Sequence, residues 1–252
     1  MQWTRANSLL LGFCFTIVLA ACSSSGDGDS STTSPPPATS AEGLWNGTTS
    51  TGRAIDGLVL DDGTYWFLYS VRGNSNIVAG LVQGSGNSQN GSFTSSDTKD
   101  FNLEGVGTLD ATIAATYVQK QTLNGTITYQ IGGTSTFAST YNADYELIPD
   151  MNLVAGTYSG LATNSDTVTV TVSSAGALSG NSTDGCTFTG AFSPRASGNV
   201  FNVAVSFGGG ACINGTGTVN GVAFFDAATK TLHSGGLNSS RTNGFIFIGT
   251  KP

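Results

Sequence analysis

Residues 167–172 read TVTVTV, six positions at which threonine and valine alternate without a break. Alternation with a period of two is the pattern of a β-strand with one apolar and one polar face. The same pattern places Val203, Val205 and Phe207 on one face of a later segment, and it assigns residues 144–147 to a further strand. Because no long stretch repeats with the helical period of 3.6, these runs predict an all-β protein.

Turn-forming pairs divide these runs. Asn-Gly and Asp-Gly tolerate the positive φ angles that tight hairpin turns require. Asn-Gly pairs begin at residues 46, 90, 124, 214, 220 and 243, and Asp-Gly pairs begin at residues 56, 62 and 184. Glycine accounts for 35 of the 252 residues, about twice its usual share. Many short strands separated by such signals are typical of an antiparallel sandwich or barrel.

A weak internal repeat predicts two modules. Residues 43–47 read GLWNG and residues 156–160 read GTYSG, and each motif opens a series of about eight candidate strands. The stretch between the two series, residues 148–152, contains a proline that cannot donate a hydrogen bond within a sheet. We therefore expect modules at residues 43–150 and 151–252. Each is predicted to be a small antiparallel meander β-barrel, since closure removes the sheet edges. The alternative is a β-sandwich in each module.

The second module divides into individual strands of about seven residues, each followed by a short turn. The predicted strands are residues 155–161, 166–173, 176–181, 186–192, 199–207, 214–225, 230–237 and 243–250.

The N-terminus has a different composition. Arg5 precedes an apolar run at residues 9–21, which is the layout of a secretory signal peptide over residues 1–21. At about 13 residues the run is too short to span a bilayer as a helix. The sequence Leu-Ala-Ala-Cys ending at Cys22 resembles the lipobox of bacterial lipoproteins. That resemblance implies that Cys22 carries fatty acyl chains such as palmitate and becomes the first residue of the mature protein. An ordinary signal peptide that leaves a cysteine near its cleavage site is the alternative.

Residues 22–42 are predicted to be a lipidated, disordered linker. From Ser23 to Glu42 the chain has no aromatic and no large aliphatic residue, so it cannot bury enough apolar surface to order itself. As a flexible coil it spans about 25 Å. Ser23 stands where enteric-type lipoproteins of the inner membrane have Asp, so the resemblance implies the outer membrane. The body of the protein then lies on either its periplasmic or its surface side.

The cysteines predict one disulfide. Cys14 leaves with the signal peptide and Cys22 carries the lipid, so Cys186 and Cys212 remain as a pair. A disulfide is the usual state of such a pair in a secreted chain, and two free buried thiols are the alternative. A metal site is disfavoured, because two cysteines without CxxC spacing and one histidine do not supply four tetrahedral ligands.

The barrel modules resemble known small barrels in their architecture. A Gly-x-aromatic-x-Gly opening, a meander and a closing apolar strand at residues 245–248 are similar to calycin-type barrels, including avidin-like and lipocalin-like domains. They are also similar to the barrel modules of transferrin-binding-protein-B-like surface lipoproteins. No motif matches the ligand-contact residues of those families, so the resemblance implies a fold and an envelope setting but no ligand.

An aromatic strand is the strongest candidate for a binding or interface element. In residues 64–69, TYWFLY, a strand places Tyr65, Phe67 and Tyr69 on one face and Trp66 on the other. A barrel strand needs only one buried face. The second face therefore meets the other module, forms a surface for a ligand or partner together with Trp45, or simply faces water. Aromatic side chains with a polar tip are common anchors at such surfaces.

The charge distribution excludes some partners. Residues 43–150 hold ten acidic and four basic side chains, against three and four in residues 151–252. An acidic module of this kind disfavours nucleic acid and anionic headgroups. Its carboxylates match no calcium-binding loop pattern, and we expect neither metal nor cofactor. The carboxylates of the first part of that module are Asp56, Asp61, Asp62, Asp97, Asp100, Glu104 and Asp110.

The sequence does not predict an enzyme. The single histidine, His233, follows Leu232 in a strand and should face outward, away from any barrel interior. There is no G-x-S-x-G elbow and no phosphate-binding glycine motif. We expect a non-enzymatic, lipid-anchored envelope protein that binds a macromolecule. One alternative is a carrier of a small apolar ligand inside a barrel, although the valines of the second module are large enough to fill one. An envelope hydrolase with paired carboxylates is a third possibility.

Overall fold

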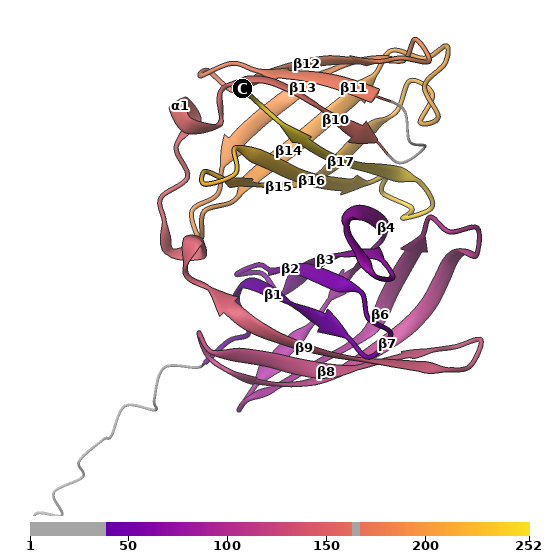
Figure 1. Cartoon of the computed structure of the whole chain (residues 1–252), viewed down its shortest axis with the longest axis vertical. Coiled ribbons are helices and arrows are strands. Elements are labelled where there is room, and N and C mark those ends of the chain that lie inside the picture. The colour runs from indigo at the N-terminus through magenta and orange to yellow at the C-terminus, as the bar shows by residue number, and fades with distance from the viewer. Residues whose placement is uncertain (1–38, 163–166) are drawn as a thin grey trace, which may run out of the picture. The chain divides into compact units, whose positions relative to one another are not determined.

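The computed structural model describes residues 39–162 and 167–252, which form two closed antiparallel β-barrels (Figure 1). The all-β class and the tandem barrels predicted from the alternating runs are confirmed, and the sandwich alternative is wrong. The expected signal peptide, Cys22 and most of the expected linker lie outside the described residues. No helix in the two described ranges is long and apolar enough to cross a membrane.

Barrel 1 has eight long strands and one short one. Its strands are β1 (Gly43–Thr49), β2 (Ala54–Val59), β3 (Thr64–Val71), β4 (Asn74–Ser85), β5 (Asn87–Gln89), β6 (Ser92–Asn102), β7 (Gly107–Val118), β8 (Thr122–Tyr129) and β9 (Thr134–Asn142). The order around the barrel is β4-β3-β2-β1-β9-β8-β7-β6, and pairing of β4 with β6 closes it. The short β5 lies beside β6.

Barrel 2 is an uninterrupted meander. Its strands are β10 (Gly156–Ala162), β11 (Thr167–Val172), β12 (Ala177–Ser182), β13 (Thr187–Pro194), β14 (Phe201–Phe207), β15 (Thr218–Asp226), β16 (Thr231–Leu237) and β17 (Gly244–Thr250). Each pairs with its neighbour in sequence, and β10 pairs with β17 to close the ring. These strands agree closely with the predicted ones, the largest difference being that β15 begins at Thr218 rather than at residue 214.

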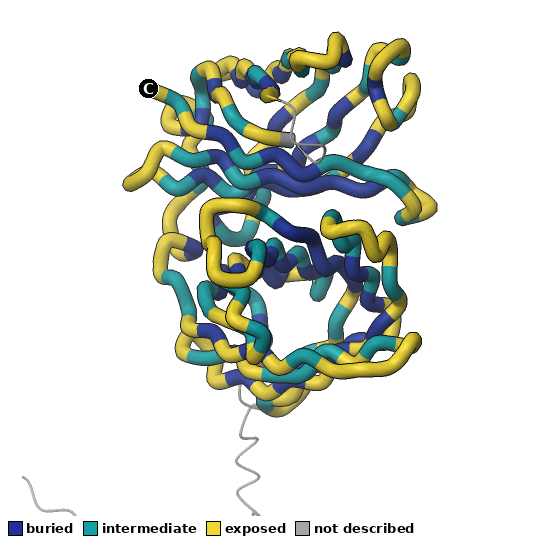
Figure 2. The backbone as a smooth tube through the Cα atoms, turned by 45° about the vertical axis from the view of Figure 1, so that its right-hand side comes forward, coloured by how far each residue is buried: buried dark blue, intermediate teal, exposed yellow. Residues whose placement is uncertain are grey.

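Alternation assigns one side chain in two to each barrel interior, and buried and exposed segments alternate along many strands (Figure 2). Val168, Val170 and Val172 of the TVTVTV segment all lie in the core of barrel 2. The core of barrel 1 is more aromatic, with Trp45 and Tyr65 both completely buried. Burying apolar side chains in this way is the main stabilising contribution to either barrel.

A third apolar cluster contains residues of both barrels. It joins Leu44, Leu58 and Leu60 of barrel 1 to Val222 of barrel 2, with Trp66 packed against it. Two arginines add polar contacts. Arg195 donates to Asp61 at 2.5 Å, and Arg241 donates to Asp97 at 3.1 Å and to the carbonyl oxygen of Gln83 at 2.7 Å. The outward face of the aromatic strand therefore meets residues of the second barrel.

The strand predicted at residues 144–147 is wrong. Strand β9 ends at Asn142, and Ala143–Glu146 form a 3₁₀ turn, η1. The Asn142 side chain accepts a hydrogen bond from the backbone N–H of Asp144 at 2.9 Å, which caps the turn and stops the strand. Tyr145 is buried but Leu147 is exposed, so the apparent alternation does not define two faces. A one-turn helix, α1 (Met151–Val154), follows before β10.

Four of the nine predicted Asn-Gly and Asp-Gly turns are also wrong. The pairs beginning at residues 46, 56, 124 and 220 lie inside strands β1, β2, β8 and β15. Their glycines serve close approach between strands rather than positive φ. A Cβ on Gly47 would lie 2.1 Å from the carbonyl oxygen of Ala138, and a Cβ on Gly57 would lie 2.0 Å from the ring of Phe67. The Asp62-Gly63 and Asn90-Gly91 pairs do form turns, with positive φ at Gly63, Asn90 and Gly91.

The predicted disulfide is present between Cys186 and Cys212, whose Cα atoms are 4.6 Å apart. It links the β12–β13 turn to the β14–β15 loop at one end of barrel 2.

We expect the double variant Cys186→Ser/Cys212→Ser to be less stable by about 3.5 kcal/mol, because the 26-residue separation sets the loop entropy that the bond removes from the unfolded chain. Urea denaturation of both proteins measures the difference. Wild-type protein treated with a reductant is the control and should lose a similar amount. An unchanged midpoint in the variant would contradict a stabilising role.

Candidate functional site

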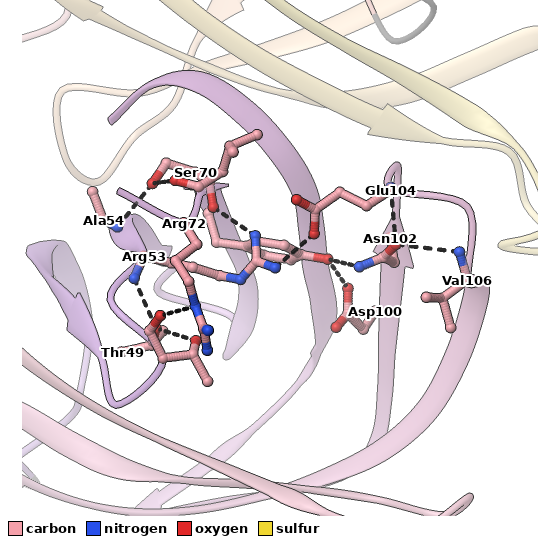
Figure 3. Close-up of polar contacts among 12 residues, drawn as sticks. Thr49, Arg53, Ala54, Ser70, Arg72, Asp100, Asn102, Glu104 and Val106 are labelled. Atoms are coloured by element: carbon pink, nitrogen blue, oxygen red, sulfur yellow. Dashed lines mark hydrogen bonds and ion pairs between the residues drawn. The ribbon is translucent and has the colours of Figure 1, made fainter. Parts of the chain in front are cut away.

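Barrel 1 has a pocket at one open end. The turns β1–β2, β3–β4, β6–β7 and β8–β9 all lie at this end, because alternate turns of an antiparallel meander share an end. The pocket has a volume of about 230 Å³ and is lined mainly by apolar side chains, among them Phe67, Leu109, Ile113 and Phe137. Its polar lining includes Arg53, Asp100 and Asn102, whose side chains lie close together in Figure 3.

A buried carboxylate forms part of the pocket wall. Asp100 on β6 is only 3% exposed. One of its oxygens accepts a hydrogen bond from the Tyr69 hydroxyl at 2.7 Å, and the other accepts one from the Tyr129 hydroxyl at 2.8 Å. Asn102 donates to the Tyr69 hydroxyl at 3.2 Å. Burial of a carboxylate is tolerated when such donors satisfy it.

Burial also sets the protonation of this group. Desolvation raises the pKa of Asp100, while the hydrogen bonds from Tyr69 and Tyr129 and the nearby charge of Arg53 act in the opposite direction. Desolvation and the charge of Asp100 both raise the pKa of Tyr69 and of Tyr129. The phenols therefore stay protonated and remain donors to the carboxylate.

A β-bulge turns Asp100 inward. The pairing of β6 with β7 shifts register between Ser95 and Thr98, so that Ser95, Thr98 and Asp100 are all buried. The Tyr65 hydroxyl hydrogen-bonds to the hydroxyls of Ser95 at 2.9 Å and Thr98 at 2.7 Å, which satisfies the polar groups that the bulge turns inward. An extra residue in one strand of a pair produces this change of face.

Arg53 also lines the pocket, near Asp100 and Tyr69. It donates to the carbonyl oxygen of Ser70 at 2.9 Å and to the Glu104 carboxylate at 2.6 Å (Figure 3). Its guanidinium lies 5.4 Å from the centre of the Tyr69 ring, a cation–π geometry. Residues from the β1–β2 turn, β3 and the β6–β7 turn are thus held together at the mouth of the pocket.

Exposed apolar side chains stand on three hairpins around this end. Ile77 near the start of β4 is 48% exposed, Val106 in the β6–β7 turn is 59% exposed, and Ile131 in the β8–β9 turn is 73% exposed. Single exposed apolar residues are common, but several of them around one pocket are typical of an interaction site. We call these three residues the rim.

The structure separates the five aromatic residues singled out from the sequence. Phe67 and Tyr69 line the pocket. Trp45 and Tyr65 lie in the core of barrel 1, where the indole N–H of Trp45 donates to the carbonyl oxygen of Ala41 at 3.0 Å. Trp66 points out of the barrel into the third apolar cluster. A joint surface of Trp45 with the outward face of the strand is therefore not formed.

Sequence reasoning missed Arg53 and Tyr129, and it named Asp100 only as one of several carboxylates. The remaining acidic residues do not gather: within residues 39–162 and 167–252 no three His, Cys, Asp or Glu side chains are placed to hold a metal ion. His233 faces away from the interior of barrel 2, as predicted, and lies beside Phe224 at a ring distance of 6.5 Å. Burial lowers its pKa.

No protein-family model matches the sequence, and no curated protein matches it. Solved structures of transferrin binding protein B do match. A single mutant of this vaccine antigen from Haemophilus parasuis Hp5 is 12% identical over 79% of this chain and 50% of that chain, with a TM-score of 0.28. A double mutant is 13% identical over 79% and 51%, with a TM-score of 0.29. Intact Ap-TbpB, with N and C lobes, is 13% identical over 78% and 54%, with a TM-score of 0.30. The chain thus spans about half the length of these structures.

We expect Asp100→Asn to change how stability depends on pH. A carboxyl whose pKa is raised in the folded state stabilises the fold fully below its unfolded pKa of about 3.9, and that contribution is lost as pH rises through the folded pKa. The unfolding free energy of the variant should therefore rise relative to that of the wild type as pH increases from about 4 to 7. Urea denaturation at several pH values measures this.

Asp144→Asn, which removes the same charge from an exposed turn, serves as the matched control. The difference in unfolding free energy between Asp100→Asn and wild type should depend on pH more strongly than that of the control. If it does not depend on pH, or follows that of the control, the carboxyl of Asp100 is not a desolvated group.

Proposed function

We propose that this chain is a non-enzymatic, lipid-anchored binding protein of the bacterial cell envelope, and that the open end of barrel 1 is its binding surface. The observation that carries the proposal is the pocket of about 230 Å³ with three exposed apolar rim residues on separate hairpins. Loops presented by a rigid barrel are the usual place for binding residues.

The chemistry of the pocket favours binding over catalysis. A general base needs a lone pair that its substrate can reach, but Asp100 is only 3% exposed and each of its oxygens accepts a hydrogen bond from a tyrosine. Arg53 is held by Glu104 and Ser70. The residues that line this pocket include no histidine and no cysteine. Fixed polar groups beside apolar walls orient a bound partner without offering a reactive atom.

The class of partner follows from the rim. Ile77, Val106 and Ile131 are apolar, and Arg72 and Glu104 on the same hairpins are exposed and oppositely charged. Apolar anchors with mixed charge at the edge are the composition of a protein–protein interface. The net charge of −7 disfavours nucleic acid. We therefore propose a macromolecular partner, a protein, that inserts side chains into the mouth of barrel 1.

The proposed membrane anchor is a lipid on Cys22. Stable membrane attachment needs two or more acyl chains, which a lipobox cysteine receives. The 20 residues from Ser23 to Glu42 allow the barrels to stand about 25 Å from the membrane surface. With Ser23 after the cysteine, we propose the outer membrane.

The alternative function expected from the sequence, carriage of a small apolar ligand, would use a different part of the molecule.

We expect Cys22→Ser to move the protein from the membrane fraction to the soluble fraction of the cells, because it removes the acyl chains that hold the chain on the bilayer. Fractionation followed by immunoblotting measures this. Cys14→Ser is the matched control, since this cysteine lies in the expected signal peptide, and it should leave membrane association unchanged. Membrane association of Cys22→Ser equal to that of the wild type would contradict the anchor.

We expect a photo-crosslinking amino acid at Ile131 to link the protein to a partner in intact cells, because this side chain stands at the proposed interface. The same amino acid at Val118 is the control, since that residue is also exposed but lies next to the β7–β8 turn, at the opposite end of barrel 1. A discrete crosslinked band from position 131 alone supports the binding surface. No band from position 131, or equal bands from both positions, would contradict it.

A further inference from the structure

Barrel 2 contains a cavity that the proposed function does not use. It opens at the end that carries the β12–β13 turn, the β14–β15 loop and the β16–β17 loop, and its volume is about 130 Å³. Most of the residues that line it are apolar, among them Val170, Val205, Phe188, Phe207 and Phe245. The large valines predicted from the sequence to fill the barrel do not fill this end of it.

We propose that this cavity binds one small, uncharged, apolar molecule of about the size of a single aromatic ring. An engineered apolar cavity of about 150 Å³ in another protein binds benzene, and the cavity of about 130 Å³ in barrel 2 is close to that size. The proposal goes beyond the binding function assigned to barrel 1, because it concerns the interior of the other barrel.

Apolar side chains also stand at the mouth of the cavity. Ile213 in the β14–β15 loop lines the cavity and is 65% exposed. Phe188 and Phe207 form an aromatic pair with ring centres 5.9 Å apart, and both are only partly buried. Apolar surface that meets water in this way is stabilised when an apolar ligand covers it.

Among the described residues, the polar groups near the mouth already have hydrogen-bond partners, which explains why the proposed ligand is uncharged. The Asn214 amide donates to the carbonyl oxygen of Gly244 at 3.0 Å, and the Asn243 amide donates to the carbonyl oxygen of Ile213 at 3.4 Å. The Ser234 hydroxyl donates to the carbonyl oxygen of Val222 at 3.0 Å, and that of Ser182 donates to Asp184. A charged or strongly polar ligand would lose its hydration without finding replacement partners here.

The disulfide holds the mouth in place. Cys186 lines the cavity, and its bond to Cys212 ties the β12–β13 turn to the loop that carries Ile213. A cavity mouth that is fixed before binding loses little conformational entropy when the ligand enters. The pocket of barrel 1 differs in its lining, since it contains the polar side chains around Asp100.

Thermal unfolding of the full chain carrying Cys22→Ser, with and without toluene, tests the proposal. Toluene should raise Tm by about 3 °C, because a ligand that binds only the folded state stabilises it. Benzoate at the same concentration has the same ring with a charge and should leave Tm unchanged. No shift with toluene, or an equal shift with benzoate, would overturn the proposal.

A pair of variants locates the effect. Val205→Phe places a larger side chain in the cavity and should abolish the toluene shift, whereas Ser206→Phe, on the exposed side of the same strand, should retain it. Val168→Leu serves as a milder filling variant if Val205→Phe does not fold, and it should reduce the shift. A toluene shift unchanged in the filling variant would place the binding elsewhere and contradict the proposal. None of these readouts depends on the partner proposed for barrel 1.

Discussion

Closure of each sheet by a final pair of antiparallel strands is the constraint on which the rest of this structure depends. In barrel 1, β4 pairs with β6, and in barrel 2, β10 pairs with β17. Without these pairings each sheet would present two edges with unpaired N–H and C=O groups, which are sites of aggregation. Closure also fixes which side chains face inward, because a shift of one residue in register would turn every side chain of a strand to the other face.

The two barrels use their interiors differently. Barrel 2 lines its open end with valine and phenylalanine, and Asn214 and Ser234 there donate to backbone carbonyl oxygens. Barrel 1 places a carboxylate inside and must satisfy it. Two tyrosine hydroxyls do so, and Arg53 with Glu104 stands over them. An unsatisfied carboxylate at this depth would cost several kcal/mol, so these side chains act as one unit that shapes the mouth of the barrel.

Much of the fold follows from the sequence, because strand alternation is a local and repetitive signal. The TVTVTV segment, the eight strands of the second module and the disulfide could all be predicted from residue order alone. The site could not. Strict alternation from Phe93 would place Asp97 and Lys99 inside barrel 1 and Asp100 outside. The bulge between Ser95 and Thr98 reverses this, and the partners that accommodate it come from β3 and β8. The in-strand Asn-Gly pairs were mispredicted for a related reason, since each depends on a close approach to another strand. The turn after Asn142 was mispredicted for a different reason, because a local side-chain hydrogen bond to the backbone of Asp144 competes with the strand there.

Intact-mass measurement of the chain extracted from membranes with detergent tests the proposed lipid anchor most directly. We expect a mature chain that begins at Cys22 and carries the added mass of a diacylglyceryl group and an N-linked acyl chain. A mass equal to that of an unmodified chain, whether it begins at Met1 or at a later residue, would contradict it.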